Sequence, residues 1–110
     1  MNKTQIFTER RTFIEGYLYA VLKSLDKFET IRYAKAPSTD AEYIRITDYV
    51  GGKVYLDITG KTDAEIFIDV SRIVLASVDK NVSYPTSLIV DKDKAFSVSY
   101  LFRAGGPKNE

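Results

Sequence analysis

The 110-residue chain contains no cysteine and no histidine. Without cysteine it has no disulfide, no thiolate nucleophile and no cysteine-based metal site. Histidine is the commonest metal ligand and the commonest general base near neutral pH. Its absence excludes serine–histidine–acid triads, cysteine–histidine dyads and the histidine-ligated sites of zinc hydrolases. The sequence therefore predicts a protein that is not an enzyme and that has no cofactor and no metal site.

The chain also lacks a strong net charge and a long hydrophobic run. Lys and Arg total 16 against 15 Asp and Glu, which leaves a net charge of +1 and no global field toward DNA or an anionic membrane. The N-terminal segment has no apolar core of the kind that signal peptides need, and no run of about 18 apolar residues occurs. We expect a soluble, cytoplasmic protein with one domain over residues 1–103 and a flexible tail over 104–110.

Two helices are predicted. Over residues 4–28 apolar side chains recur in steps of four and three, which is the period of an amphipathic helix. A second helix is expected to follow Thr62, which forms a capping box with Glu65, and to continue to Val78. The Gly-Lys-Thr sequence at its start also occurs in phosphate-binding loops, but such a loop needs another glycine where this chain has Tyr55. The capped helix is therefore the preferred interpretation.

Residues 43–59 alternate between apolar and polar side chains on either side of Gly51 and Gly52, which is the pattern of a β-hairpin. A two-residue turn at the glycines would place the apolar rows of the two strands on opposite faces. Because side chains alternate with a period of two, a change of one residue in register brings both rows to the same face. We therefore predict a three-residue loop, 50–52, in which Gly52 takes the left-handed conformation.

In this register Ile46 is expected opposite Leu56, and Arg45 opposite Asp57 on the other face. That other face is predicted to be open, because its side chains are polar or aromatic. Such a surface can stack bases and follow a phosphate backbone, although tyrosine is also favoured in strands for packing alone. The candidate binding residues on this face are Tyr43, Arg45, Lys53, Tyr55 and Asp57.

The rest of the chain is also predicted to form strands, at 31–34, 86–91 and 95–102; the last alternates apolar side chains from Phe96 to Phe102. The sequence thus predicts an α+β fold in the order α-β-β-β-α-β-β, with an antiparallel sheet of four to five strands and two helices packed on one face. The order of a helix, three strands and a helix resembles the double-stranded RNA-binding domain. Its second helix opens on acidic side chains where that family carries a basic cluster, so the resemblance implies no function.

The two predicted helices carry more apolar surface than one sheet face can cover. Phe13 and Tyr17 on the first helix, and Ile68 and Leu75 on the second, lie outside the main core stripes. Contiguous exposed apolar surface usually marks an interface, and a two-fold homodimer is its commonest form. The alternative is that both helices are covered within one chain.

We therefore expect a small non-enzymatic interaction module that forms a homodimer or binds another protein. The first alternative is an accessory nucleic-acid-binding protein that uses the Tyr/Arg sheet face. The second is an enzyme that relies on Asp, Glu, Lys or Tyr, since these are the ionisable side chains the composition leaves for catalysis.

Overall fold

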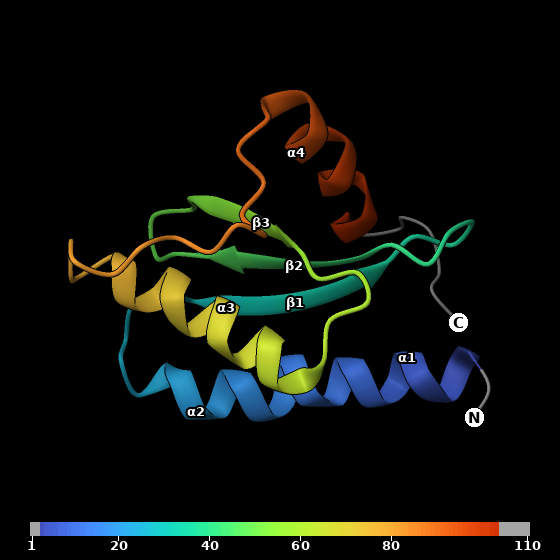
Figure 1. The fold of residues 1–110 in the computed structure, drawn as a ribbon, viewed down its shortest axis with the longest axis horizontal. Helices are drawn as coiled ribbons and strands as arrows, with labels where there is room; N and C mark the ends of the chain where they lie inside the picture. The colour runs from blue at the N-terminus through green and yellow to red at the C-terminus, as the bar shows by residue number, and fades with distance from the viewer. Residues whose placement is uncertain (1–2, 104–110) are drawn as a thin grey trace.

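A computed structural model describes residues 3–103 of the chain. A three-stranded antiparallel sheet in the order β1-β2-β3 lies between two helical layers (Figure 1). The long N-terminal helix and α3 cover one face, and α4 covers the other. The elements are α1 (Lys3–Arg11), η1 (Thr12–Leu18), α2 (Tyr19–Lys23), β1 (Thr30–Lys35), β2 (Glu42–Thr47), β3 (Lys53–Asp57), α3 (Asp63–Ala76), α4 (Lys92–Ser99) and η2 (Tyr100–Phe102). The predicted flexible tail, 104–110, lies outside the described residues.

The predicted N-terminal helix is confirmed as one continuous element made of α1, η1 and α2, in which η1 is a π-helix. It ends at Lys23, five residues before the predicted end. Asp26 adopts a left-handed φ of 53°, which stops the helix. The ammonium group of Lys23 then ties this end to the hairpin loop, because it donates to the Phe28 carbonyl at 2.7 Å and to the Tyr49 hydroxyl. The hydrogen bond to Tyr49 is the main reason why the pKa of Lys23 is raised.

The hairpin keeps the predicted faces but not the predicted pairs. Ile44 lies opposite Leu56 and Ile46 opposite Val54, so the apolar rows share a face and the two-residue turn is excluded. The register nevertheless differs by two residues from the prediction. Arg45 lies opposite Tyr55 and not opposite Asp57.

The side chain of Asp48 explains this difference in register. Its Oδ1 accepts the backbone N–H groups of Val50 at 3.0 Å and Gly52 at 2.7 Å, while its own N–H donates to the Gly52 carbonyl at 2.9 Å. The loop is therefore 49–51, and Gly51, with a φ of 87°, takes the left-handed conformation predicted for Gly52. A Cβ atom at Gly52 would lie 2.5 Å from the Asp48 carboxylate, so a larger residue there would displace the side chain that sets the turn.

The predicted fourth and fifth strands do not form in the described part of the chain, so the expected fold class was wrong in its strand number and layering. Residues 92–99 form α4, because the side chain of Asp91 caps the helix by accepting the Lys94 N–H at 3.0 Å. The segment before it contributes only an isolated bridge, between Leu88 and Leu56. The fold is still α+β, but it has three strands and helices on both faces of the sheet.

Both edges of the sheet are partly covered. At β1, Glu15 from the N-terminal helix accepts the outward N–H of Tyr33 at 2.8 Å. At β3, the N–H of Asp57 donates to the Ser87 carbonyl and the N–H of Ile89 donates to the Tyr55 carbonyl, both at 2.9 Å. Covered edges oppose pairing with a strand from another chain. The candidate binding surfaces are therefore the helices and the sheet faces.

The predicted capping box at α3 is confirmed and gives a pH-dependent prediction. Glu65 accepts the Thr62 N–H at 2.9 Å, and this bond is the main cause that lowers the pKa of Glu65. A lowered pKa means that the box stabilises the fold above the ordinary carboxyl pKa and that this contribution is lost as pH falls through the lowered value. In urea unfolding, Glu65→Ala should be less stable than the native chain at pH 7, and this difference should narrow near pH 3.

The control for this experiment is Thr62→Ala, which removes the other half of the box. Its hydroxyl accepts the Glu65 N–H at 3.2 Å and does not titrate. The variant should lose about 1 kcal/mol at both pH values. If the difference between Glu65→Ala and the native chain were equally large at both pH values, the carboxylate would not act through the box.

Candidate functional site

The sheet face that was predicted to be open is largely covered by α4 and η2 (Figure 1). Tyr43 and Tyr55 are buried in a cluster with Val98 of α4, and the Phe102 ring centre lies 5.8 Å from that of Tyr55. The expectation of an open tyrosine platform was therefore wrong, because the C-terminal segment folds over these side chains instead of extending the sheet. Asp57 is occupied by Thr59, whose hydroxyl donates to its carboxylate at 2.6 Å.

Arg45, which is half-buried, and the exposed Lys53 lie on this face, and the exposed Arg103 joins them. The three cations, with Tyr55, Ser99 and Phe102, line a hollow of about 210 Å³, which we call the cationic hollow. The guanidinium carbon of Arg45 lies 5.2 Å from the centre of the Phe102 ring. The sequence predicted three of the lining residues but missed Arg103, which only the helical course of α4 and η2 brings back to the sheet.

The cations of the hollow have no carboxylate partner in the described part of the chain. Within residues 3–103 no Asp or Glu forms an ion pair with Arg45, Lys53 or Arg103. Arg32, which lies opposite Arg45 on β1, adds a further positive charge, but it faces Glu15 at 3.6 Å. The register explains this excess of positive charge, since the pairing that was predicted would have placed Asp57 beside Arg45.

Two buried polar atoms lie at the same end of the sheet face. The Arg45 Nε and the Thr47 hydroxyl are buried and lack a hydrogen-bond partner in the described part of the protein. Thr47 is two residues after Arg45 on β2, so both side chains point to the same face, and it lies directly opposite Lys53. Burying such groups unpaired costs about 1–3 kcal/mol each, and more for a charged group.

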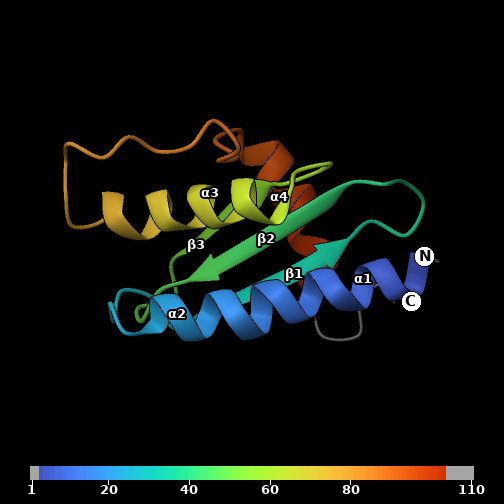
Figure 2. The same cartoon turned by 60° about the horizontal axis from the view of Figure 1, so that its bottom comes forward.

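A second candidate surface lies along the N-terminal helix and α3, which run side by side over the other sheet face (Figure 2). At one end, Phe13, Phe67 and Ile68 help to line a shallow hollow of about 340 Å³, and the ring of Phe13 stacks on that of Tyr17 at 5.7 Å. Tyr17, Ile68 and Leu75 are 57%, 52% and 39% exposed, whereas Phe13 is half-buried. We call this apolar surface the helix seam; it comprises Phe13, Tyr17, Phe67, Ile68 and Leu75.

The other end of the two helices meets the hairpin around a cavity of about 310 Å³. Apolar side chains line most of it, among them Phe28, Ile46 and Ile73, and Lys27 and Lys53 lie at its polar part. The long-range packing of α3 against the hairpin creates this cavity. No short motif in the sequence predicts this cavity.

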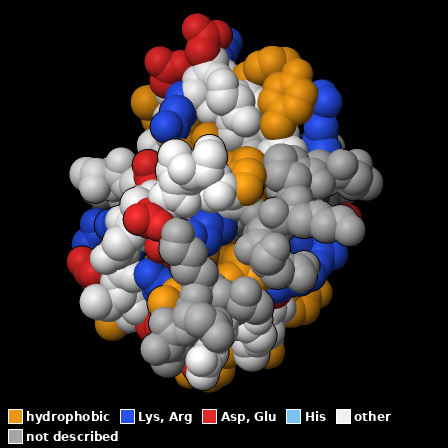
Figure 3. Space-filling model, turned by 90° about the vertical axis from the view of Figure 1, so that its right-hand side faces the viewer, with side chains coloured by type: hydrophobic (Ala, Val, Ile, Leu, Met, Phe, Trp, Pro, Cys, Tyr) orange, Lys and Arg blue, Asp and Glu red, His pale blue; other side chains and the backbone are white. Residues whose placement is uncertain are grey.

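A further group of exposed apolar side chains lies on α4. Figure 3 shows hydrophobic side chains at the surface of this part of the molecule. Phe96 is 61% exposed, and its ring packs edge-on against Tyr100 at 5.2 Å. This patch competes with the helix seam as a place where a partner could bind.

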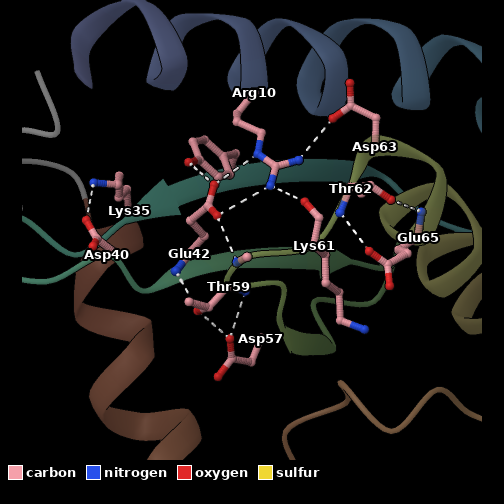
Figure 4. A network of polar contacts seen from close by, with 12 residues as sticks. Arg10, Lys35, Asp40, Glu42, Asp57, Thr59, Lys61, Thr62, Asp63 and Glu65 are labelled. Atoms are coloured by element: carbon pink, nitrogen blue, oxygen red, sulfur yellow. Dashed lines mark hydrogen bonds and ion pairs between the residues drawn. The ribbon is translucent and has the colours of Figure 1, made fainter. Parts of the chain in front are cut away.

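The charged residues that converge most closely are all paired (Figure 4). Glu42, which is buried, accepts hydrogen bonds from Arg10 Nε at 3.1 Å and from the Tyr33 hydroxyl at 2.8 Å. Arg10 also donates to Asp63 at 2.9 Å and to the Lys61 carbonyl. Burial, followed by the hydrogen bond to Glu42, raises the pKa of Tyr33.

This cluster, the Arg10–Glu42 clamp, joins the N-terminal helix to β2 and to the loop before α3. Because Arg10, Glu42 and Tyr33 satisfy one another, we interpret the clamp as structural and not as a catalytic site. Sequence reasoning missed it because Arg10 and Glu42 are 32 residues apart and neither belongs to a recognisable motif. Among the described residues, no group of three or more Asp or Glu side chains is placed to hold a metal ion.

Comparison with known proteins finds no matching family model, no similar curated protein and no similar solved structure. Over residues 3–103, no helix has the length and apolar character needed to cross a membrane. Function must therefore be inferred from the surfaces of this chain.

Proposed function

We propose that the protein is a non-enzymatic interaction module that self-associates through the helix seam. The observation that carries this proposal is the exposure of Tyr17, Ile68 and Leu75 after all the described helices have packed on the sheet. Apolar surface of this kind, contributed by two adjacent helices, is typical of an interface between subunits. A two-fold axis would place the same patch of both copies in contact, so one apolar surface covers the other.

Sedimentation velocity over a concentration series tests the proposal. The native chain should show a monomer–dimer equilibrium, and Ile68→Glu should weaken the dimer by about 30-fold, because a charge would enter the centre of the interface. Phe96→Asp is the matched control, since it places a charge on the competing patch of α4 and should leave the dimer intact. Circular dichroism verifies that both variants fold.

Two results would contradict the proposal. If the native chain sediments as a monomer at every concentration, it does not self-associate and the proposal is wrong. A dimer that Phe96→Asp disrupts and Ile68→Glu does not would place the interface on α4 and not on the helix seam.

The nucleic-acid alternative is less well supported by this geometry. It required Tyr43 and Tyr55 as an open stacking platform, and both are covered by α4. Base stacking on aromatic rings supplies much of the affinity of proteins for single strands. Of the basic side chains on this face, Arg45, Lys53 and Arg103 line the cationic hollow.

A further inference from the structure

We propose that the cationic hollow is a binding site for the phosphate group of a small phosphorylated ligand. Arg45, Lys53 and Arg103 come from two strands and from the end of the C-terminal helical segment, and they line one hollow. Their convergence on one point is the first observation, because like charges repel and a fold gains no stability from gathering them without an acid.

The lack of ion pairs is the second observation. Arg45, Lys53 and Arg103 form no ion pair with any described carboxylate, and Arg45 has only the ring of Phe102 beside its guanidinium group, at 5.2 Å. Guanidinium and ammonium groups left in this state are available to an external oxyanion. Two arginines and a lysine together favour an anion with a double negative charge, which is the form of a phosphate monoester near neutral pH.

The buried polar atoms are the third observation. The Arg45 Nε–H is a donor without a partner, and the nearby Thr47 hydroxyl is in the same state. A phosphate carries several acceptor oxygens and would offer Arg45 the partner it lacks, once the side chains that bury the Nε–H shift to admit the ligand.

The size of the hollow limits the ligand. Its volume of about 210 Å³ is below the roughly 300–1,000 Å³ that is typical of sites enclosing a drug-sized molecule. It fits a phosphoryl group whose organic part remains outside. A strand of nucleic acid would need an extended basic groove with exposed aromatic rings, and the tyrosines of this face are buried.

A structural explanation for part of the charge also exists. The C-terminal end of α4 carries partial negative charge, and Arg103 lies just beyond it, over the ring of Tyr100 at 4.0 Å. This accounts for Arg103 but not for Arg45 and Lys53, which lie on the strands. The two explanations differ in what they predict for the Nε–H of Arg45, and NMR observes that group directly.

The test is a titration followed by ¹H–¹⁵N NMR at constant ionic strength, with inorganic phosphate, ribose 5-phosphate and sodium acetate as probes. Both phosphates should shift the Arg45 Nε–H signal and the backbone amides of Lys53 and Ser99 along saturable curves. Acetate, which carries a single charge, should bind at least about tenfold more weakly. A fourth probe, a single-stranded oligonucleotide without terminal phosphate, distinguishes a phosphate monoester from a nucleic-acid backbone.

Variants identify the groups responsible. Arg45→Lys keeps the charge but removes the Nε–H donor, and Lys53→Gln removes an exposed charge. Each should weaken phosphate binding by about tenfold, which corresponds to the loss of one charge-assisted hydrogen bond. Lys92→Gln is the control, because it removes an exposed lysine from the first position of α4, whereas the hollow lies at the other end of this helix, and it should change affinity by less than about twofold.

Three results would overturn the proposal. The chemical shift of the Arg45 Nε–H could stay constant while phosphate is added until all other chemical-shift changes have saturated. The control Lys92→Gln could weaken binding as much as Lys53→Gln, which would indicate unspecific attraction. The oligonucleotide could saturate the hollow while both phosphates fail, which would assign the surface to nucleic acid.

Discussion

Replacing Arg10 with alanine is expected to lower the free energy of unfolding by about 3–5 kcal/mol. The substitution would leave the carboxylate of Glu42 buried at the centre of the clamp without the cation that now lies 3.1 Å from it. Breaking a buried ion pair from one side is costly because the remaining charge has lost its partner and cannot reach water. Urea unfolding of the native chain and the variant measures the difference.

Two further variants make this result specific. Arg11→Ala removes the neighbouring arginine, whose pair with Glu15 is more exposed, and should cost under about 1 kcal/mol. Adding Glu42→Gln to Arg10→Ala removes the unpaired charge and should recover part of the lost stability. A loss below about 1 kcal/mol for Arg10→Ala would show that the clamp does not hold the N-terminal helix in place.

The second large effect is expected at Val98, on the opposite face of the sheet. Val98→Asp would place a carboxylate among Tyr43 and Tyr55, in a cluster where Val98 is now buried. The cost should be about 3 kcal/mol or more, or else α4 should detach from the sheet. Hydrogen exchange measures either outcome, since the amides of 92–102 should lose protection before those of the sheet.

Phe96→Asp is the matched control for this experiment. In a strand, Phe96 and Val98 would share one face, and both substitutions would have similar effects. In α4 they point in different directions, and Phe96 is exposed, so its replacement should change stability by under about 0.5 kcal/mol. Equal damage from the two variants would contradict the helical structure of this segment.

The hairpin shows how far sequence reasoning reaches. The alternation of Ile44 and Ile46 determines which side chains of the hairpin share the apolar face, because the face has a period of two. The individual pairs depend on the turn, and the turn is set by hydrogen bonds from one side chain, that of Asp48. A shift of two residues preserves the pattern of burial, so the pattern alone could not detect it.

The C-terminal segment shows why an apolar pattern can mislead. Phe96, Val98, Tyr100 and Phe102 alternate as in a strand, but the side chains that face the sheet are Ala95, Val98, Leu101 and Phe102, at a helical spacing. Asp91 was predicted as the last residue of the strand 86–91, although Asp is also a good N-cap residue. Eight residues of α4 contain too few repeats for periodicity to separate the two structures.

The candidate sites also differ in whether the local sequence pattern or the long-range packing defines them. The exposed residues of the helix seam could be predicted because each helix carries its own apolar pattern. The cationic hollow could be predicted only in part, since Arg45 and Lys53 are neighbours on the hairpin while Arg103 arrives through the packing of α4 and η2. The excess of positive charge there depended on the register, which the sequence did not determine.

The central claim is that the C-terminal segment is a helix lying over the second face of the sheet, because this placement buries the tyrosines and completes the cationic hollow. Nuclear Overhauser spectroscopy tests it most directly. The structure predicts contacts from the Phe102 ring to the side chains of Tyr55 and Arg45, and contacts from Ala95 to Val98 within a helix. Cross-strand contacts between residues 86–91 and 95–102, with no contact from Phe102 to Tyr55, would contradict it.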